Sequence, residues 1–465
     1  MPRVRRLLKH LILGTALSLG VLSLPTAFAD TPTVESTDQP AAISLLPGLE
    51  TQVEFWKQIF ATYSTRQVVI HDALHLNRIY TVLDFRPLAD SGAGDAEVNA
   101  YAKGKVESEK ERIRAALLRL HQIGPDSPEL TPEERKIGAL FAHVKDPMKF
   151  LRAAADDRIR GQWGLRERFA AGVELSRRYL PEMESIFRRA GLPMELTRLP
   201  LVESCFNVRA YSKVGAAGIW QFMPATAKRY MEVNRAVDER RDPIASTRAA
   251  AEHLKDNYEV LGNWPLAITA YNHGRAGMVN AVSTVGSSDL VEIIRRYHGP
   301  AFKFASRNFY AEFLAALDVE RHFESYFGDL HPHRPLRTET VVVPEYVNVR
   351  ALAQAASTDV DTLADLNPAL TGPVVSGRLL VPKGHLLRVP AGAAAGFRDR
   401  YANVVVKYQR STPQRRYVTH RVKRGQTLAG IAKHYRTTVA AIQRRNNLQR
   451  TSRLRTGQSL VIPTG

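Results

Sequence analysis

Residues 203–223 read ESCFNVRAYSKVGAAGIWQFM, and most predictions for this chain of 465 residues depend on this stretch. Its one carboxylate, Glu203, stands between the apolar side chains of Val202 and Phe206. A carboxyl group among large apolar side chains tends to keep its proton at neutral pH. Such a proton can be donated to a leaving oxygen by general acid catalysis. The alternative is a solvated or helix-capping glutamate, which is the ordinary role of this residue type.

Prolines and glycines predict that Glu203 lies at the end of a helical element. Apolar residues form one stripe at helical spacing from 165 to 187, and Gly191 ends the second helix of this segment. Pro193 opens a short segment that Pro200 stops from continuing as a regular helix. Glu203 is therefore expected at an element end that faces a cleft, rather than along a buried stripe.

Helix start signals recur after the glycine-rich turn. Asp242 and the proline after it open a helix over residues 246–261. Asn263, again followed by a proline two residues later, opens the next helix, which ends at Tyr271 and Asn272. This part of the chain is predicted to be mainly α-helical.

The order of three motifs resembles the family 1 lytic transglycosylases, enzymes with a goose-lysozyme-like catalytic domain that cut peptidoglycan. The motifs are Glu203-Ser204, the Gly-Ile-Trp-Gln run of residues 218–221, and Ala270-Tyr-Asn. The resemblance covers the chain from about residue 50 to its end. Its long form, with a helical region before the catalytic domain and LysM modules after it, is similar to the membrane-bound lytic murein transglycosylase D group.

The resemblance implies one catalytic residue, Glu203, and a set of substrate-binding residues. Tyr271 can hydrogen-bond a carboxylate, and Asn272 can both donate to and accept from an acetamido group. The residues expected to line the cleft are Ser204, Ser212, Gln221, Met223, Tyr271 and Asn272.

The family's fourth motif is altered in this chain. A helix over residues 306–327 opens with Ser306, Arg307, Asn308 and Phe309, where the family has Thr-Arg-x-Tyr. Phenylalanine thus stands in place of a tyrosine that lines the active site. Either the hydroxyl is dispensable, or Tyr310 supplies it after a local shift, or Phe309 is part of the core.

The resemblance also implies a mechanism with one carboxylate. Glu203 would cleave the β-1,4 bond between N-acetylmuramic acid and N-acetylglucosamine and leave a 1,6-anhydromuramoyl end. Most glycosidases use two carboxylates, but no acidic residue stands in a second motif, and Asp242 is explained as a helix cap. No cofactor and no metal are expected, because the histidines lack ligand spacing. The alternatives are a lysozyme-like hydrolase of the same bond and a non-catalytic peptidoglycan-binding protein.

Charge and the first residues predict an exported protein with an anionic partner. The formal net charge is +19. Residues 1–29 combine a basic start, an apolar segment from 11 to 24 and a small-residue cleavage site, which is typical of a signal peptide. An N-terminal membrane anchor is the alternative. We expect a periplasmic protein that binds peptidoglycan strands and no nucleic acid, since export removes it from nucleic acid.

Cys205 is the only cysteine of the chain. An intramolecular disulfide is therefore excluded, and so is a lipid anchor on a cysteine next to the cleavage site. A thiol nucleophile beside Glu203 is one interpretation of this residue. A small buried side chain is the favoured one, because cysteine is among the most buried residue types.

The expected fold is mainly α, with a goose-lysozyme-like helical catalytic domain preceded by a helical region and followed by two small βααβ LysM-type modules. No chemistry is recognised in the helical region, where a helical pattern is expected to run from Leu49 to Leu83. The expected boundaries are 1–29 for the signal peptide, 30–48 for a flexible leader, 49–160 for the helical region, 161–328 for the catalytic domain, 339–390 for a degenerate module, 391–414 for a linker and 415–464 for the second module.

The C-terminal third contains an internal repeat. Residues 424–463 resemble a LysM module, a βααβ unit that binds N-acetylated glycans. A shift of 79 residues places Val439 on Val360 and Asn446 on Asn367, and residues 380–382 are matched to the final strand at 461–463. The first copy lacks the Gly-Gln-Thr-Leu start of the second. Residues 411–465 hold twelve Lys and Arg and no acidic residue, which favours a polyanionic partner.

Overall fold

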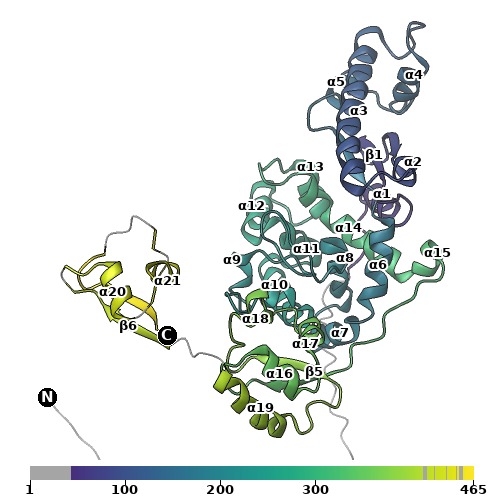
Figure 1. Ribbon diagram of the computed structural model, residues 1–465. Helices are drawn as coiled ribbons and strands as arrows, with labels where there is room; N and C mark the ends of the chain where they lie inside the picture. The colour runs from purple at the N-terminus through teal and green to yellow at the C-terminus, as the bar shows by residue number, and fades with distance from the viewer. Residues whose placement is uncertain are drawn as a thin grey trace, which may run out of the picture. The chain divides into compact units, whose positions relative to one another are not determined.

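The computed structural model describes residues 43–411 and 416–464, apart from residues 424, 436, 447 and 450–453. Figure 1 shows that helices dominate these residues, as predicted, and that the strands occur in small groups. The predicted signal peptide and most of the leader lie outside the described residues. No helix within the described residues has the length and apolar character needed to cross a membrane.

A three-stranded antiparallel sheet lies in the region that was predicted to be helical. Its strands are β1 (Gln67–Asp72), β2 (Ile79–Asp84) and β3 (Ile159–Trp163), in the order β2-β1-β3. The prediction of helix up to Leu83 was therefore wrong over these strands. The runs Val-Val-Ile in β1 and Ile-Tyr-Thr-Val in β2 contain β-branched and aromatic residues, which pack well on a pleated surface. In so short a segment, apolar spacing alone did not distinguish strand from helix.

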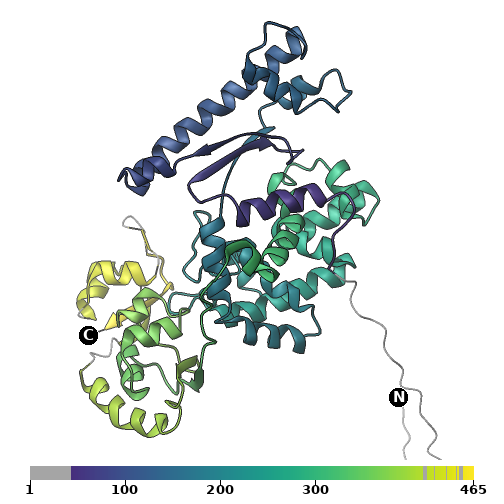
Figure 2. The same ribbon diagram turned by 90° about the vertical axis from the view of Figure 1, so that its right-hand side faces the viewer.

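The helices before residue 160 divide between two cores. The long helix α3 (Asp95–Ile123) packs on the sheet and on α4 (Pro132–Ala139) and α5 (Lys149–Ala153), and these elements share one core. The short helix α2 (Arg86–Asp90) precedes them. By contrast, α1 (Glu50–Ala61) packs against α14 (Phe304–Arg321), and its Trp56 and Phe60 belong to the main core of the chain. Figure 2 shows α3 lying along the sheet, away from the helices of that core.

The main core is built by the helices between residues 166 and 327. Asp242 accepts hydrogen bonds from the amides of Ile244 and Ala245 and begins α10, and Asn263 caps α11 in the same way through the Leu266 amide, so both predicted helix starts are confirmed. The elements are α6 (Arg166–Ser176), α7 (Leu180–Arg189), the 3₁₀ helix η1 (Met194–Arg198), α8 (Leu199–Ser204), α9 (Pro224–Ala227), the 3₁₀ helix η2 (Glu239–Arg241), α10 (Pro243–Leu261), α11 (Trp264–His273), α12 (Arg275–Val285), α13 (Leu290–Arg296), α14 and α15 (Phe323–Phe327).

Two βααβ modules follow, as the repeat predicted. The first contains β4 (Thr338–Val342), α16 (Val349–Ala355), α17 (Val360–Leu366), a further short helix α18 (Gly372–Val375) and β5 (Leu386–Pro390). The second contains β6 (Arg416–Arg421), α20 (Leu428–His434), α21 (Val439–Arg445) and β7 (Ser459–Thr464). In each module the two strands pair antiparallel. Both helix pairs keep the predicted shift, since α17 begins at residue 360 and α21 at residue 439.

The final strand of the first module lies later than predicted. Asn446 donates to the Val461 carbonyl and accepts from its amide, and Asn367 makes the same two bonds with Arg388. The structural partner of Val461 is thus Arg388 and not a residue of 380–382. The asparagine and its partner in the final strand are 21 residues apart in the first module and 15 residues apart in the second. An insertion of six residues before β5 therefore shifted the register of the sequence match.

The segment expected to be a linker is partly a helix of the first module. Residues 397–411 form α19, which packs on α16. Phe397, Tyr401 and Val404 are buried in the core of that module. The run of alanine and glycine before this helix gave the segment the composition of a linker, although Phe397, Tyr401 and Val404 recur at helical spacing and pack inward.

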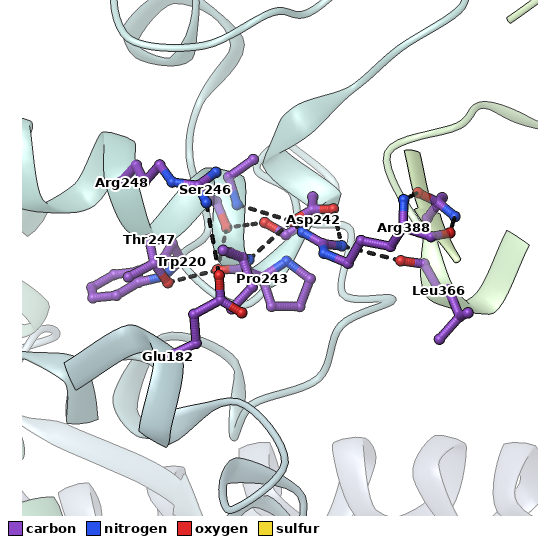
Figure 3. Close-up of polar contacts among 12 residues, drawn as sticks. Glu182, Trp220, Asp242, Pro243, Ser246, Thr247, Arg248, Leu366 and Arg388 are labelled. Atoms are coloured by element: carbon purple, nitrogen blue, oxygen red, sulfur yellow. Dashed lines mark hydrogen bonds and ion pairs between the residues drawn. The ribbon is translucent and has the colours of Figure 1, made fainter. Parts of the chain in front are cut away.

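The first module is held on the catalytic helices by a partly buried ion pair. The Arg388 guanidinium donates both to the Asp242 carboxylate and to the Leu366 carbonyl (Figure 3). The exposed fractions of the two side chains are 14% for Arg388 and 8% for Asp242. Val237, which precedes α10, is fully buried in the core of the module. The amide of Asp238 also donates to the Ala369 carbonyl at 2.8 Å.

Replacing Arg388 by alanine should lower the free energy of unfolding by about 3 kcal/mol, because the Asp242 carboxylate stays buried without its cation. Arg209→Ala is the matched control. Arg209 joins the same two parts of the chain through Asp365, but their side chains are 83% and 69% exposed, so its loss should cost less than about 1 kcal/mol. Urea unfolding of both variants measures the difference. Equal stability of the two would show that the Arg388 pair does not hold the module.

Candidate active site

Glu203 lies in the last turn of α8, where the helix is ended by a strained turn. The backbone φ angles of Cys205 and Phe206 are 49° and 56°, in the left-handed region that side chains other than glycine disfavour. The Phe206 amide donates to the Pro200 carbonyl at 3.0 Å and the Cys205 amide to the Leu201 carbonyl at 3.2 Å, which closes the helix end. Full burial of the Phe206 ring helps to offset the strain.

Two glycines allow backbone segments to pack closely around the candidate site. A Cβ atom on Gly172 of α6 would lie 2.7 Å from the Cys205 carbonyl oxygen. A Cβ atom on Gly218 would lie 1.7 Å from the Arg240 carbonyl oxygen, and Gly218 also has a φ of +74°. Only glycine satisfies both conditions at residue 218. The glycine of the Gly-Ile-Trp-Gln run is therefore required by packing as well as by conformation.

Several predicted site residues hold the loop that follows Glu203. The Ser204 hydroxyl donates to the Ile219 carbonyl at 2.9 Å, and the Ser212 hydroxyl accepts from the Ala216 amide at 2.8 Å. Gln221, with a φ of 48°, donates from its side chain to the Gly218 carbonyl at 2.7 Å. Ser204 and Gln221 thus support the loop that follows Glu203, and Ser212 closes a turn within it.

The fully buried Trp220 connects this loop to α10 and α11. Its indole nitrogen donates to the Thr247 hydroxyl at 2.9 Å, and that hydroxyl donates to the Pro243 carbonyl in the first turn of α10 (Figure 3). Its ring stacks on Phe187 with a centroid distance of 6.0 Å. Its carbonyl accepts from the Tyr271 hydroxyl at 2.8 Å. The Tyr271 proton is therefore used on the loop backbone and not on the Glu203 carboxylate.

Asn272 and Met223 are accessible to a ligand. Asn272 is exposed, and its side-chain oxygen accepts from the Ser306 hydroxyl at 3.0 Å. The Met223 side chain is 42% exposed at the start of α9. His273 is partly buried and packs against the Phe302 ring, with a centroid distance of 5.0 Å.

Phe309 and Tyr310 belong to the core. Phe309 is 3% exposed and Tyr310 is 1% exposed. The Tyr310 hydroxyl donates to the Ser44 carbonyl at 2.7 Å, so it does not replace the tyrosine hydroxyl missing at residue 309. Of the three interpretations of the altered motif, the structure thus leaves a dispensable hydroxyl and a core role for Phe309. It does not bring Tyr310 to the cleft.

The Glu203 carboxyl group is in an environment that favours its neutral form. Burial raises its pKa to about 8, and no described residue contributes a cation or hydrogen bond to its carboxylate. Burial, and secondly the charge of Glu203, raise the pKa of Tyr271 well above its usual range. Burial raises the pKa of the Cys205 thiol to about 11, so this residue is a neutral thiol and not a nucleophile at neutral pH.

A second acid, Glu312 of α14, was missed by sequence reasoning. Burial, and then the charge of Glu203, raise its pKa to about 8. The signal that could have found it is an acidic residue within the apolar run from Phe309 to Ala316. Among the described residues, no group of three or more His, Cys, Asp or Glu could hold a metal ion.

Replacing Gly218 by alanine should destabilise the fold by more than about 2 kcal/mol, because the methyl group adds a backbone clash to the cost of the left-handed conformation. Gly286→Ala is the control, since Gly286 has a φ of +72° and open space around its Cβ position. It should cost about 1 kcal/mol. Thermal unfolding of both variants tests this, and a Gly218→Ala variant as stable as Gly286→Ala would contradict the packing argument.

Comparison with known proteins assigns domains to these regions. Residues 184–293 match the family described as Transglycosylase SLT domain, residues 337–406 the Lytic transglycosylase MltD, LysM-like domain, and residues 420–463 the LysM domain. The chain is 28% identical over 358 residues to the membrane-bound lytic murein transglycosylase D of Escherichia coli K12. This match covers 73% of this chain and 75% of that protein. The same values hold for the protein of that name in E. coli O6:H1.

A solved structure, the 70 kDa soluble lytic transglycosylase SLT70 of E. coli, is 15% identical with a TM-score of 0.26. The match covers 51% of this chain, and the chain spans about half of that protein, 47%. Glu203, the glycine-rich loop, Trp220 and Tyr271 all fall within the residues matched by the SLT family. The chain carries a transglycosylase SLT domain followed by an MltD-type LysM-like domain and a LysM domain.

Proposed function

We propose that this protein is a lytic transglycosylase that cuts the β-1,4 bond between N-acetylmuramic acid and N-acetylglucosamine in peptidoglycan. The observation that supports this most directly is Glu203, an SLT-domain carboxyl group whose pKa burial raises to about 8. It carries its proton at neutral pH. The similarity to lytic murein transglycosylase D along most of the chain supports the same reaction.

In the first step Glu203 acts as a general acid. Its proton passes to the glycosidic oxygen, which leaves as the 4-hydroxyl of N-acetylglucosamine as the bond to the muramic C1 breaks. The acetamido oxygen of the muramic residue bonds C1 from the opposite face and takes up the positive charge. No second protein carboxylate is needed as a nucleophile in this step.

In the second step Glu203 acts as a general base. Its carboxylate removes the proton of the muramic C6 hydroxyl, the C6 oxygen bonds C1, and the acetamido oxygen is released. The product is a 1,6-anhydromuramoyl end, no water is consumed, and Glu203 regains its proton. The burial that makes Glu203 an acid also makes its carboxylate a stronger base than one in water.

Hydrolysis of the same bond is the second candidate function. The observation that favours it is Glu312, because two carboxyl groups at one site are the usual equipment of a glycosidase. In that reaction a water molecule attacks in place of the C6 hydroxyl and leaves a reducing muramic end.

The setting we propose is the periplasm, with the glycan strands of peptidoglycan as the partner. The predicted signal peptide supports export, and the LysM domain supports glycan binding. Residues 411–465 carry twelve basic and no acidic residues, which suits the carboxylates of the stem peptides. A lipid anchor is not part of this proposal, since the only cysteine is Cys205.

The product distinguishes the two reactions. Purified peptidoglycan digested by the wild-type chain should yield muropeptides one water lighter than those released by a lysozyme, without a reducing muramic end, as measured by mass spectrometry. Reducing ends would contradict transglycosylation and favour hydrolysis. Binding without any released product would contradict both reactions and favour a non-catalytic peptidoglycan-binding protein.

Glu203→Gln should fold and bind peptidoglycan but lose turnover by at least about a hundredfold, because the amide has no proton to give. Glu195→Gln is the control, since it is the same substitution in the neighbouring η1, outside the motifs of the candidate site. Release of soluble muropeptides measures turnover, and sedimentation with peptidoglycan measures binding. Near-normal turnover in Glu203→Gln would refute the assignment of the acid.

A further inference from the structure

A polar cluster that the proposed mechanism does not use lies on the helices around Tyr271. It consists of Tyr230, which follows α9, His253 and Asp256 of α10, and Arg275, the first residue of α12. Both α10 and α12 pack against α11, which carries Tyr271. The cluster is therefore assembled from three separate segments of the SLT-matched region.

Hydrogen bonds within the cluster determine which nitrogen of His253 carries the proton. The Tyr230 hydroxyl donates to the Asp256 carboxylate at 2.7 Å, and Nδ1 of His253 lies 3.2 Å from the same hydroxyl oxygen. The hydroxyl has only one proton, which Asp256 accepts, so Nδ1 is the donor in the second bond. Burial, and then the charge of Arg275, lower the pKa of His253 to about 4. In the neutral ring, Nδ1 thus carries the proton and Nε2 the lone pair.

Two groups of the cluster are available to a ligand. Nε2 of His253 has no hydrogen-bond partner among the described residues, and it is not buried. The Arg275 guanidinium makes one contact within the same residues, from Nη1 to the Asp256 carboxylate at 3.5 Å, and its side chain is 24% exposed. Its other nitrogens keep their N–H donors. The cluster thus offers one neutral acceptor and several cationic donors.

The charge around these groups favours an anionic ligand. The charges that act on His253 are those of Arg275, Asp256 and Arg229, two positive and one negative. Arg229 lies over the Tyr230 ring, 5.5 Å from its centroid. A planar guanidinium binds a carboxylate more strongly than it binds a neutral carbonyl. A carboxylate is therefore a better partner for Arg275 than the uncharged acetamido group of a sugar.

The cluster adjoins the candidate active site through aromatic rings. The His253 ring contacts the Tyr271 ring with a centroid distance of 5.4 Å and the Phe222 ring with one of 6.1 Å. Met223, which follows Phe222, and Asn272, which follows Tyr271, are both exposed. The accessible residues of the site are thus next in the chain to the two rings that His253 contacts.

We propose that His253 and Arg275 form a subsite for the stem peptide of peptidoglycan. Nε2 of His253 accepts a peptide N–H, and the Arg275 guanidinium binds a carboxylate of the peptide. Tyr230 and Asp256 do not touch the ligand but hold the His253 tautomer and the guanidinium in place. The inference rests on the proposed function, since the muramic residue whose C1 reacts also carries the stem peptide and brings it to the surface beside the site.

The test compares two soluble substrates, uncross-linked glycan strands with stem peptides and the same strands after an amidase has removed the peptides. Arg275→Gln in the full chain should raise KM about tenfold for the peptide-bearing strands, because a hydrogen-bonded charge pair is lost. It should leave kcat, and KM for the bare strands, near the wild-type values. His253→Phe keeps the ring contacts but loses the acceptor, and should raise KM for the peptide-bearing strands about threefold.

Arg248→Gln is the matched control. Arg248 is an arginine of α10 that pairs with Glu182 at 3.7 Å, and both side chains are about half exposed (Figure 3). The substitution removes the same charge from the helices of the site but leaves the cluster intact, so KM should stay unchanged for both substrates. A rise as large as in Arg275→Gln would overturn the proposal, because it would report a general loss of positive charge.

An unchanged KM for peptide-bearing strands in a folded Arg275→Gln variant would overturn the inference. An equal rise for both substrates would also overturn it, because Arg275 would then bind the sugars and not the peptide. Failure of the proposed function is seen separately, as wild-type chain that binds both substrates and cuts neither. The subsite is then tested by calorimetry, where Arg275→Gln should bind a disaccharide with its stem peptide about tenfold more weakly than the wild type does. Equal affinity would overturn the inference.

Discussion

The candidate site depends on the contacts of one buried residue, Trp220. It joins three elements, because its ring packs on α7, its nitrogen donates to Thr247 of α10 and its carbonyl accepts from Tyr271 of α11. The loop that carries it lies against Arg240, where only glycine fits at residue 218. Thr247 in turn donates to the Pro243 carbonyl in the first turn of α10. Asp242 caps this helix and forms an ion pair with Arg388 of the LysM-like module. The module therefore supports the same network that holds the loop after Glu203.

The parts of this structure that could be predicted from the sequence are those encoded by neighbouring residues. Caps such as Asp242 and Asn263 are visible because the chemistry of a helix start lies within four residues. Glu203 could be predicted as the candidate acid because it and its apolar neighbours form one short stretch. The 79-residue repeat was visible because both helix pairs keep their spacing.

What could not be predicted depends on segments that meet only in the folded chain. Glu312 lies more than a hundred residues after Glu203, and nothing in its own helix indicates that α8 packs there. The Arg388–Asp242 pair spans 146 residues. The strands at 67–84 were mistaken for helix because a short apolar run fits both periods. The final strand of the first module was misplaced because an insertion broke the register that the helices had kept.

The pair of acids in the cleft also affects how the protein folds. Burial holds both carboxyl groups protonated up to a pH of about 8, while an ordinary glutamate with a pKa of 4.5 has lost its proton at neutral pH. Folding of the catalytic domain at neutral pH therefore takes up protons from solution. As the pH rises above the ordinary pKa of a glutamate, the unfolded chain loses these protons before the folded domain does, so the free energy of unfolding falls. The stability of the domain therefore decreases toward alkaline pH, through the same two carboxyl groups whose pKa values are raised in the candidate site.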